Sequence, residues 1–568
     1  MSDSRHPAHM AQANKDEQAC DMQIESFEDR ASDEEKELQA KAEKSSNMVS
    51  VLVIISRITG FMRTWVQANA IGVSMLASCY TVAATMPNFL YELVMGGMLI
   101  TSFLPVYMSV KKRLGAQEAA KYASNLLSLV LILMVIVTAL SWIFAAPLIW
   151  TQSAGASPDF DFNLAVFFFR FFAFEIILYA LSSIISGVLN AERDYFWSNA
   201  APILNNVITI ASFSLYSFAI KTGVVSPQAA LLILAIGNPL GVAVQVFAQI
   251  PALRKHGVKL HLHVDLHDPA IRETLSIGLP TLVVTFASFP TSAVQSSCAL
   301  QVTASGASIA YYSRIWYVLP YSILAIPISV TMFTELSAAR VAGDMDAFVR
   351  DVAAGAKKIM FTLIPFVFFL ILFAPCLISI IASGAFGQED ALLTVRYLQV
   401  QALALPFYGL STYLQKVCSS LLKMKFYAFA TCVAAVIQVA CCLIFTQGVN
   451  LYVVPLSSTF FFIAIDIVTL LHLRRELGPL HLSGVVTSTI RGCIFGLMGT
   501  AVGYAIIKLM SFVLPSVYSS GFWGLIYAVC GGIPALIASF GLATRLGKSD
   551  APFFDAIFSK VSRVLSRA

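Results

Sequence analysis

Long apolar runs separated by short polar segments recur from Asn47 almost to the end of the chain. Each run reaches the roughly 20 residues that an α-helix needs to cross about 30 Å of hydrocarbon. The runs are far longer than the roughly 10-residue alternating strands of an outer-membrane barrel, and only helices or closed barrels satisfy the backbone in lipid. The pattern therefore predicts an all-α polytopic membrane protein.

The runs predict about fourteen transmembrane helices when each is matched to the thickness of a bilayer. Their centres lie near Ile55, Leu93, Ile136, Ala173, Ile210, Val242, Thr285, Tyr321, Pro365, Leu405, Ala435, Phe461, Leu497 and Ile533. Basic residues gather in the loops after even-numbered spans, as at 111–113 and 254–259, whereas the other loops hold Lys221 and almost nothing else basic. Because basic loops stay in the cytoplasm, both termini are predicted to be cytoplasmic.

Composition agrees with a membrane protein, since 58% of the residues are hydrophobic and only 12% are charged, against about 25% charged in soluble domains. Residues 1–46 differ, with twelve acidic and six basic residues and few large apolar side chains. They are predicted to form a disordered acidic cytoplasmic tail. We find no GxxxxGK[ST] nucleotide-binding loop, so no ATP chemistry is expected, and we expect neither a cofactor, a metal site nor nucleic-acid binding.

An internal repeat indicates how the spans are grouped. "YALSSIISGVL" from Tyr179 matches "YGLSTYLQKVC" from Tyr408, and Pro87 in "TMPNFLYELV" matches Pro320 in "VLPYSILAIP" at a similar offset. Because each half would hold an even number of spans, the halves would share one orientation, with substrate between them. The prediction is two six-helix lobes, residues 47–255 and 256–476, followed by two extra helices in 477–550 and a cytoplasmic tail, 551–568.

Charged residues inside the apolar runs are the candidates for function, because a charge at depth lines a cavity or has a partner. Arg57, Glu92 and Arg314 lie deepest, and Arg63 follows Arg57 in "SRITGFMR". Arginine matches phosphate oxygens bidentately, so these residues suit a phosphate-bearing substrate. An ion pair between Arg57 and Glu92 is the structural alternative. Further charges in or near the runs are Arg170, Glu175, Arg396, Lys416, Asp466 and Arg491.

Four stretches resemble the MurJ (MviN) family of lipid II flippases. They are "SRITGFMRTWVQANAIG", "MPNFLYELVMGGMLITSFLPVY", "YYSRIWYVLPYSILAIPISVTMFTELSAARVAGD" and "SGAFGQEDALLTVRYLQVQALALPFYGL", in the family's order and spacing. The resemblance implies two six-helix lobes plus two helices, as in the multidrug/oligosaccharidyl-lipid/polysaccharide exporter superfamily. It also implies that Arg57, Arg63 and Arg314 engage the pyrophosphate of lipid II.

The chain departs from the family pattern in the second span. The departures are Ser78 in place of Asp, Thr85 in place of Lys, Tyr91 and Glu92 in place of a doubled Arg, and Gly96 in place of Glu. Glu92 is therefore the candidate for the acidic, transport-coupling role. No motif identifies the source of energy, for which the membrane potential and a bound cation are both open.

The resemblance implies a lipid II flippase of the bacterial cytoplasmic membrane that works by alternating access, with lipid II, the bilayer and cell-wall synthesis proteins as partners. Three alternatives stay open. The first is an exporter of another polyprenyl-linked saccharide or of drugs, and the second is a non-transporting scaffold of the cell-wall synthesis complex. The third is an enzyme, a polyprenyl-linked glycosyltransferase. Such an enzyme would be expected to carry an acidic catalytic motif or a large extracytoplasmic loop, and we see neither in the sequence.

Overall fold

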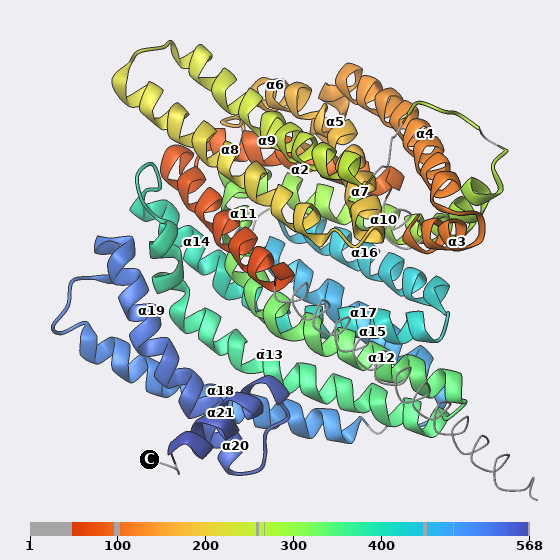
Figure 1. Ribbon diagram of the computed structural model, residues 1–568. Coiled ribbons are helices and arrows are strands. Elements are labelled where there is room, and N and C mark those ends of the chain that lie inside the picture. The colour runs from red at the N-terminus through yellow and green to blue at the C-terminus, as the bar shows by residue number, and fades with distance from the viewer. Residues whose placement is uncertain are drawn as a thin grey trace, which may run out of the picture.

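The computed structural model describes residues 48–95, 103–256, 261–265, 267–446, 451–480 and 482–565, and within these ranges every regular element is a helix (Figure 1). The first part comprises the first helix (Met48–Ile71), α2 (Met75–Met95), α3 (Leu104–Leu114), α4 (Ala116–Ile143), α5 (Ala145–Ser153), α6 (Phe162–Phe172), α7 (Glu175–Ala191), α8 (Tyr195–Thr222) and α9 (Pro227–Lys255). The second part comprises α10 (Pro269–Val302), α11 (Gly306–Pro320), α12 (Ile326–Ala342), α13 (Met345–Ile381), α14 (Gln388–Gln401), α15 (Leu405–Ser420), α16 (Met424–Thr446) and α17 (Val453–Leu477). The remaining helices are α18 (Ser483–Met510), α19 (Gly521–Leu536), α20 (Leu542–Arg545) and α21 (Pro552–Leu565).

Eleven helices among the described residues are long and apolar enough to cross a membrane. The predicted spans near Leu93, Thr285 and Leu405 are not among these eleven, although all three positions belong to or adjoin helices. The segment near Leu405 is divided into two helices, α14 and α15, which are joined by a 3₁₀ turn. In addition, α14 begins with the polar sequence "QED". The all-helical membrane fold is confirmed, whereas the count of fourteen stays a prediction.

The two halves of the chain pack in the same order. In the first half α7 packs against α4 and α9, and α8 packs against α9. In the second half α15 packs against α13 and α17, and α16 packs against α17. The repeated motifs at Tyr179 and Tyr408 lie in the equivalent helices α7 and α15. Each half also surrounds its own cluster of buried apolar side chains, so the fold has two lobes.

The segment between the lobes associates with the first one. The Asn125 side-chain amide, on α4, donates hydrogen bonds to the Asp265 carbonyl at 2.8 Å and to the Asp268 carboxylate at 3.1 Å. The Tyr122 hydroxyl lies 2.7 Å from the Thr274 hydroxyl at the start of α10. The predicted boundary at 255/256 stays a prediction, and the predicted tail, residues 1–46, lies outside the described residues.

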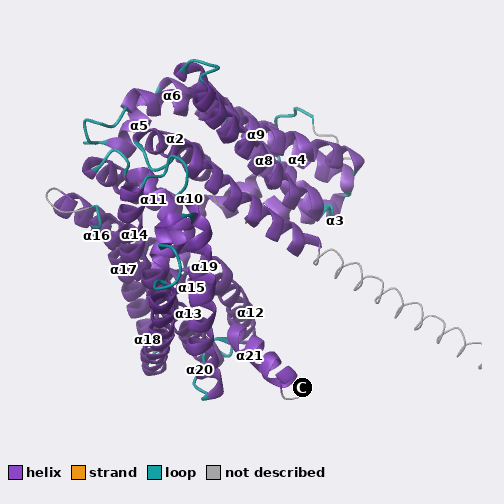
Figure 2. Ribbon diagram, turned by 90° about the vertical axis from the view of Figure 1, so that its left-hand side faces the viewer, coloured by secondary structure: helices purple, strands orange, loops and turns teal. Residues whose placement is uncertain are grey.

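The two lobes meet at one end and diverge toward the other (Figure 2). At the closed end the Ser308 amide of α11 donates to the Ser78 hydroxyl of α2 at 3.1 Å, and the Ala385 amide donates to the Asn69 carbonyl at 3.0 Å. Ser78 is thus part of the contact between the lobes.

Two glycines allow the backbones to approach at this closed end. Gly72 and Gly384 both have positive φ, 60° and 64°, which costs glycine little. A Cβ on Gly72 would collide with the Ala385 carbonyl, and one on Gly384 would collide with the Asn69 carbonyl. One glycine from each lobe is therefore needed for the lobes to touch as they do.

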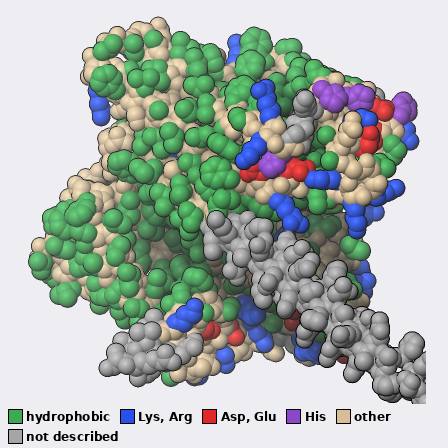
Figure 3. All heavy atoms as spheres, viewed as in Figure 1, with side chains coloured by type: hydrophobic (Ala, Val, Ile, Leu, Met, Phe, Trp, Pro, Cys, Tyr) green, Lys and Arg blue, Asp and Glu red, His purple; other side chains and the backbone are tan. Residues whose placement is uncertain are grey.

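Apolar side chains cover most of the face seen in Figure 3, and charged side chains gather toward its right and lower edges. This distribution is the one expected of a bundle whose middle lies in hydrocarbon and whose charged loops lie in water.

Candidate functional site

The first helix runs between the two lobes and contacts both. It is helical without interruption from Met48 to Ile71, so Gly60 does not break it. The Asn206 side-chain amide of α8 donates to the Thr59 hydroxyl at 3.1 Å, which fixes the helix to the first lobe. On its other side the Phe61 ring packs edge-on against Trp316 of α11, with centroids 5.7 Å apart.

Arg63 lies deep between the lobes. Its half-buried guanidinium is within interaction distance of the hydroxyls of Tyr80 and Tyr179 from the first lobe and of Tyr311 from the second. It also interacts electrostatically with the carboxylate of Glu175. The cation predicted from the sequence therefore lies in a polar, tyrosine-lined site between the lobes.

Glu175 is the main functional candidate to which the sequence analysis gave no role. It is 0% exposed at the first position of α7, directly after the turn that separates α6 from α7. Its carboxylate accepts hydrogen bonds from the Asn238 amide at 2.8 Å and from the Tyr179 hydroxyl at 3.0 Å. An acid in an apolar run was visible in the sequence, but its approach to Arg63 depends on how α7 packs against the first helix.

Arg314 lies on α11, one helical turn after Tyr311, and its side chain is exposed. It interacts electrostatically with Tyr317, Tyr397 and Tyr408. The repeat thus places one tyrosine of the same motif near each arginine: Tyr179 near Arg63 and Tyr408 near Arg314. Since Tyr311 interacts electrostatically with Arg63 and lies one helical turn before Arg314 on α11, the structure brings Arg63 and Arg314 to the same region.

Arg57 and Glu92 lie apart from this pair. Arg57 is exposed on the first helix, about 9 Å along the axis from Arg63 on the side away from the closed end. Glu92 is exposed on α2 and accepts a hydrogen bond from the Asn88 amide at 2.9 Å. Within the described ranges neither residue forms an ion pair. The alternative Arg57 to Glu92 pair is therefore not formed in this conformation.

An apolar pocket of about 230 Å³ lies beside α11, between it, α13 and α19. Its walls include Trp316, Pro320, Phe366, Phe373 and Gly532. Trp316 follows Arg314 by two residues, so α11 carries both a cation and part of the wall of this apolar pocket.

No group of three or more His, Cys, Asp or Glu in the described part of the chain could hold a metal ion. His261, His263 and His267 are exposed, and the described cysteines form no disulfide.

Two lobes of equivalent packing with a cationic, tyrosine-lined site between them define a two-lobed helical membrane protein. The fold is similar to a solved lipid II flippase MurJ in an inward closed conformation, at 21% identity and a TM-score of 0.68 over 88% of this chain and 99% of that one. It is also similar to an inward-facing multidrug resistance transporter of the MATE family, at 18% identity and a TM-score of 0.58 over 75% of this chain and 98% of that one.

The model of the family described as lipid II flippase MurJ matches residues 67–523, and the chain belongs to this family. Arg314 and Glu92 lie inside the matched range, and Arg57 and Arg63 lie before it. The resemblance found in the sequence is confirmed, and flippase function is the function that the family supports.

Curated relatives carry the same description. A probable lipid II flippase MurJ of Buchnera aphidicola is 24% identical over 63% of this chain and 69% of its own length. The probable MurJ of Treponema pallidum is 26% identical over 61% of this chain, and the match spans 65% of that protein, slightly under two thirds. The lipid II flippase MurJ of Thermosipho africanus is 24% identical over 64% of this chain and 72% of its own length.

Proposed function

We propose that the protein moves lipid II, the undecaprenyl-pyrophosphate-linked disaccharide-pentapeptide, from the inner to the outer leaflet of the bacterial cytoplasmic membrane by alternating access. Both termini would be cytoplasmic, and the closed end of the two lobes would then face outward. The observation that carries the proposal is the placement of Arg63 and Arg314 in one tyrosine-lined region between lobes that are closed at a single end.

The site suits a diphosphate because its groups match phosphate oxygens. Guanidinium groups donate paired hydrogen bonds to phosphate, and tyrosine hydroxyls donate single ones. Arg57 lies nearer the open end than Arg63, so an entering headgroup would meet Arg57 first and then Arg63 and Arg314. These contacts would offset the cost of moving a charged diphosphate through a region of low polarity.

Glu175 would be the acidic neighbour of Arg63 in the substrate-free protein. Its buried side chain interacts electrostatically with Arg63. An incoming diphosphate would interact with the same guanidinium, so binding would weaken the interaction of Arg63 with Glu175 and release of substrate would restore it. No covalent step is needed. Energy would come from the membrane potential or a bound cation, and Glu92 remains our candidate for coupling.

The apolar pocket beside α11 provides a location for part of the polyprenyl tail. It is lined by α11, α13 and α19, and therefore lies on the side where the two helices beyond the lobes pack. Arg314 and Trp316 lie on different sides of α11, so the tail of a headgroup held by Arg314 would pass around this helix to reach the pocket, while the rest of the tail stays in lipid.

A competition experiment with the purified full-length protein tests the substrate. Labelled lipid II is bound, and unlabelled lipid II, undecaprenyl pyrophosphate, another polyprenyl-pyrophosphate-linked saccharide and a cationic drug are added separately. We expect lipid II to compete best and undecaprenyl pyrophosphate to compete more weakly. Equal competition by the other lipid-linked saccharide, or displacement by the drug alone, would contradict the proposal in favour of a different exporter.

A further inference from the structure

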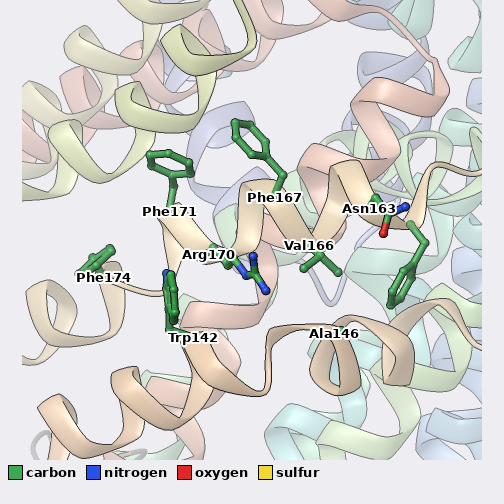
Figure 4. A pocket seen from close by; sticks show the side chains of 9 residues that line it. Trp142, Ala146, Asn163, Val166, Phe167, Arg170, Phe171 and Phe174 are labelled. Carbon is green, nitrogen blue, oxygen red and sulfur yellow. The ribbon is translucent and has the colours of Figure 1, made fainter. Parts of the chain in front are cut away.

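A second cationic pocket lies on the first lobe, away from the site between the lobes. It has a volume of about 520 Å³ and lies between the end of α4, the start of α5, and α6 (Figure 4). Aromatic side chains, including Trp142, Phe167, Phe171 and Phe174, form most of its wall. Arg170 is its only charged lining residue, and Figure 4 shows the guanidinium extending from α6 into the space near Val166 and Trp142.

The Arg170 charge has no acidic partner within the described ranges. Its guanidinium lies over the Trp142 ring, 5.3 Å from the centroid, and this is a cation–π contact. Trp142 is 46% exposed and Phe174 is 53% exposed, so the pocket opens on the outside of the lobe. An arginine on an apolar outer surface extends its charge to water at the interface or pairs with an anion there.

The span was predicted to be centred near Ala173, but its helices run from Phe162 to Ala191, so Arg170 lies in the half of the span that begins at Phe162. Along the span formed by α6 and α7, Arg170 is 22 residues before Glu192, which is bridged to Lys111 at the opposite end. At 1.5 Å per residue this separation is about 33 Å, close to the hydrocarbon thickness. Trp142 is likewise typical of an interfacial position. With the orientation proposed above, this interface belongs to the outer leaflet.

We propose that the pocket binds the phosphate group of an anionic phospholipid from the outer leaflet, of the phosphatidylglycerol type. The Arg170 guanidinium would pair with the phosphate, and Asn163 offers an amide donor at the same pocket. The aromatic walls would contact the glycerol and the first methylenes of the acyl chains. The volume lies within the roughly 300 to 1,000 Å³ that ligand pockets usually have. This site is independent of lipid II binding.

Native mass spectrometry of the full-length protein, titrated with lipids of identical acyl chains, tests the proposal. The probes are phosphatidylglycerol, zwitterionic phosphatidylcholine and uncharged diacylglycerol. We expect one saturable site that prefers phosphatidylglycerol. Arg170→Gln should weaken it roughly tenfold or more, as expected for the loss of a charge-assisted hydrogen bond. The matched control is Arg396→Gln, which removes another exposed arginine of an apolar run and should leave the affinity unchanged.

A second variant keeps the proposal testable if Arg170→Gln does not fold. Ala146→Trp would fill the pocket from α5 and retain every charge, and it should also abolish the site. Lipid II binding should be unchanged in both variants, which separates this proposal from the proposed function. Equal affinity for the three lipids, an equal effect of Arg396→Gln, or full affinity in Ala146→Trp would each overturn it.

Discussion

Replacement of Arg63 by Ala tests whether this residue serves the substrate or only the fold. The variant would remove the electrostatic interaction between Arg63 and the buried Glu175 side chain. Glu175 keeps its hydrogen bonds from Asn238 and Tyr179, and Arg63 is only half buried. We therefore expect a modest loss in the free energy of unfolding, within the roughly 0.5 to 3 kcal/mol found for coupled side chains.

The double variant Arg63→Ala with Glu175→Gln separates the two roles. Glutamine removes the buried charge, so the double variant should recover most of the lost stability, as measured by unfolding of the purified protein in detergent. It should not recover lipid II binding. A hydrogen bond to a charged group contributes roughly 1.5 to 3 kcal/mol, so loss of Arg63 should weaken binding by about 10 to 150-fold in both variants.

Three results would refute this reasoning. Normal lipid II binding by a folded Arg63→Ala protein would exclude Arg63 from the substrate site. Recovery of binding as well as stability in the double variant would reduce Arg63 to a structural partner of Glu175. Equal instability of the single and double variants would show that the two residues are not energetically coupled.

The remaining predictions concern the second arginine, the topology and the charged end of the first lobe. Arg314→Lys should bind lipid II better than Arg314→Ala but worse than the wild type, because lysine keeps the charge and loses the paired donors; equal binding by both variants would contradict this. Cysteines introduced in residues 151–161 should react with an external membrane-impermeant reagent, and cysteines in 254–259 should not; the reverse pattern would invert the orientation. Burial alone would raise the pKa of Glu192, but hydrogen bonds and the Lys111 charge hold it below its usual 4.5. The stabilisation that the Glu192–Lys111 pair contributes should therefore be complete above about pH 4.5 and disappear as the pH falls through the lowered pKa of Glu192. Lys111→Met removes this pair, so the stability of the variant, measured by unfolding in detergent, should depend less on pH in the acidic range.

The fold class was predictable because each long apolar run must be a helix in lipid. The deep arginines were predictable for a similar reason, since a charge in such a run needs a partner or a cavity. The repeat also predicted equivalent helices, and the structure adds that Tyr179 and Tyr408 accompany Arg63 and Arg314.

The role of Glu175 could not be predicted in the same way, because its distance from Arg63 depends on the packing of α7, α9 and the first helix. The sequence shows that both residues are present, but it does not show that they lie close together. The same holds for Gly72 and Gly384, which lie more than 300 residues apart and have a clear role only where the lobes touch. Helix interruptions are also hard to predict from hydrophobicity alone, as the division between α14 and α15 shows.

The central claim is that Arg63 and Arg314 hold the diphosphate while the headgroup crosses between the lobes. The most direct measurement is the appearance of lipid II headgroup on the opposite leaflet of proteoliposomes containing the full-length protein, compared with Arg63→Ala, Arg314→Ala and the control Arg396→Ala. The account predicts translocation by the wild type and the control, and strongly reduced translocation by the other two variants at equal amounts of folded protein. Unchanged translocation by both Arg63→Ala and Arg314→Ala, or no translocation by the wild type, would contradict it.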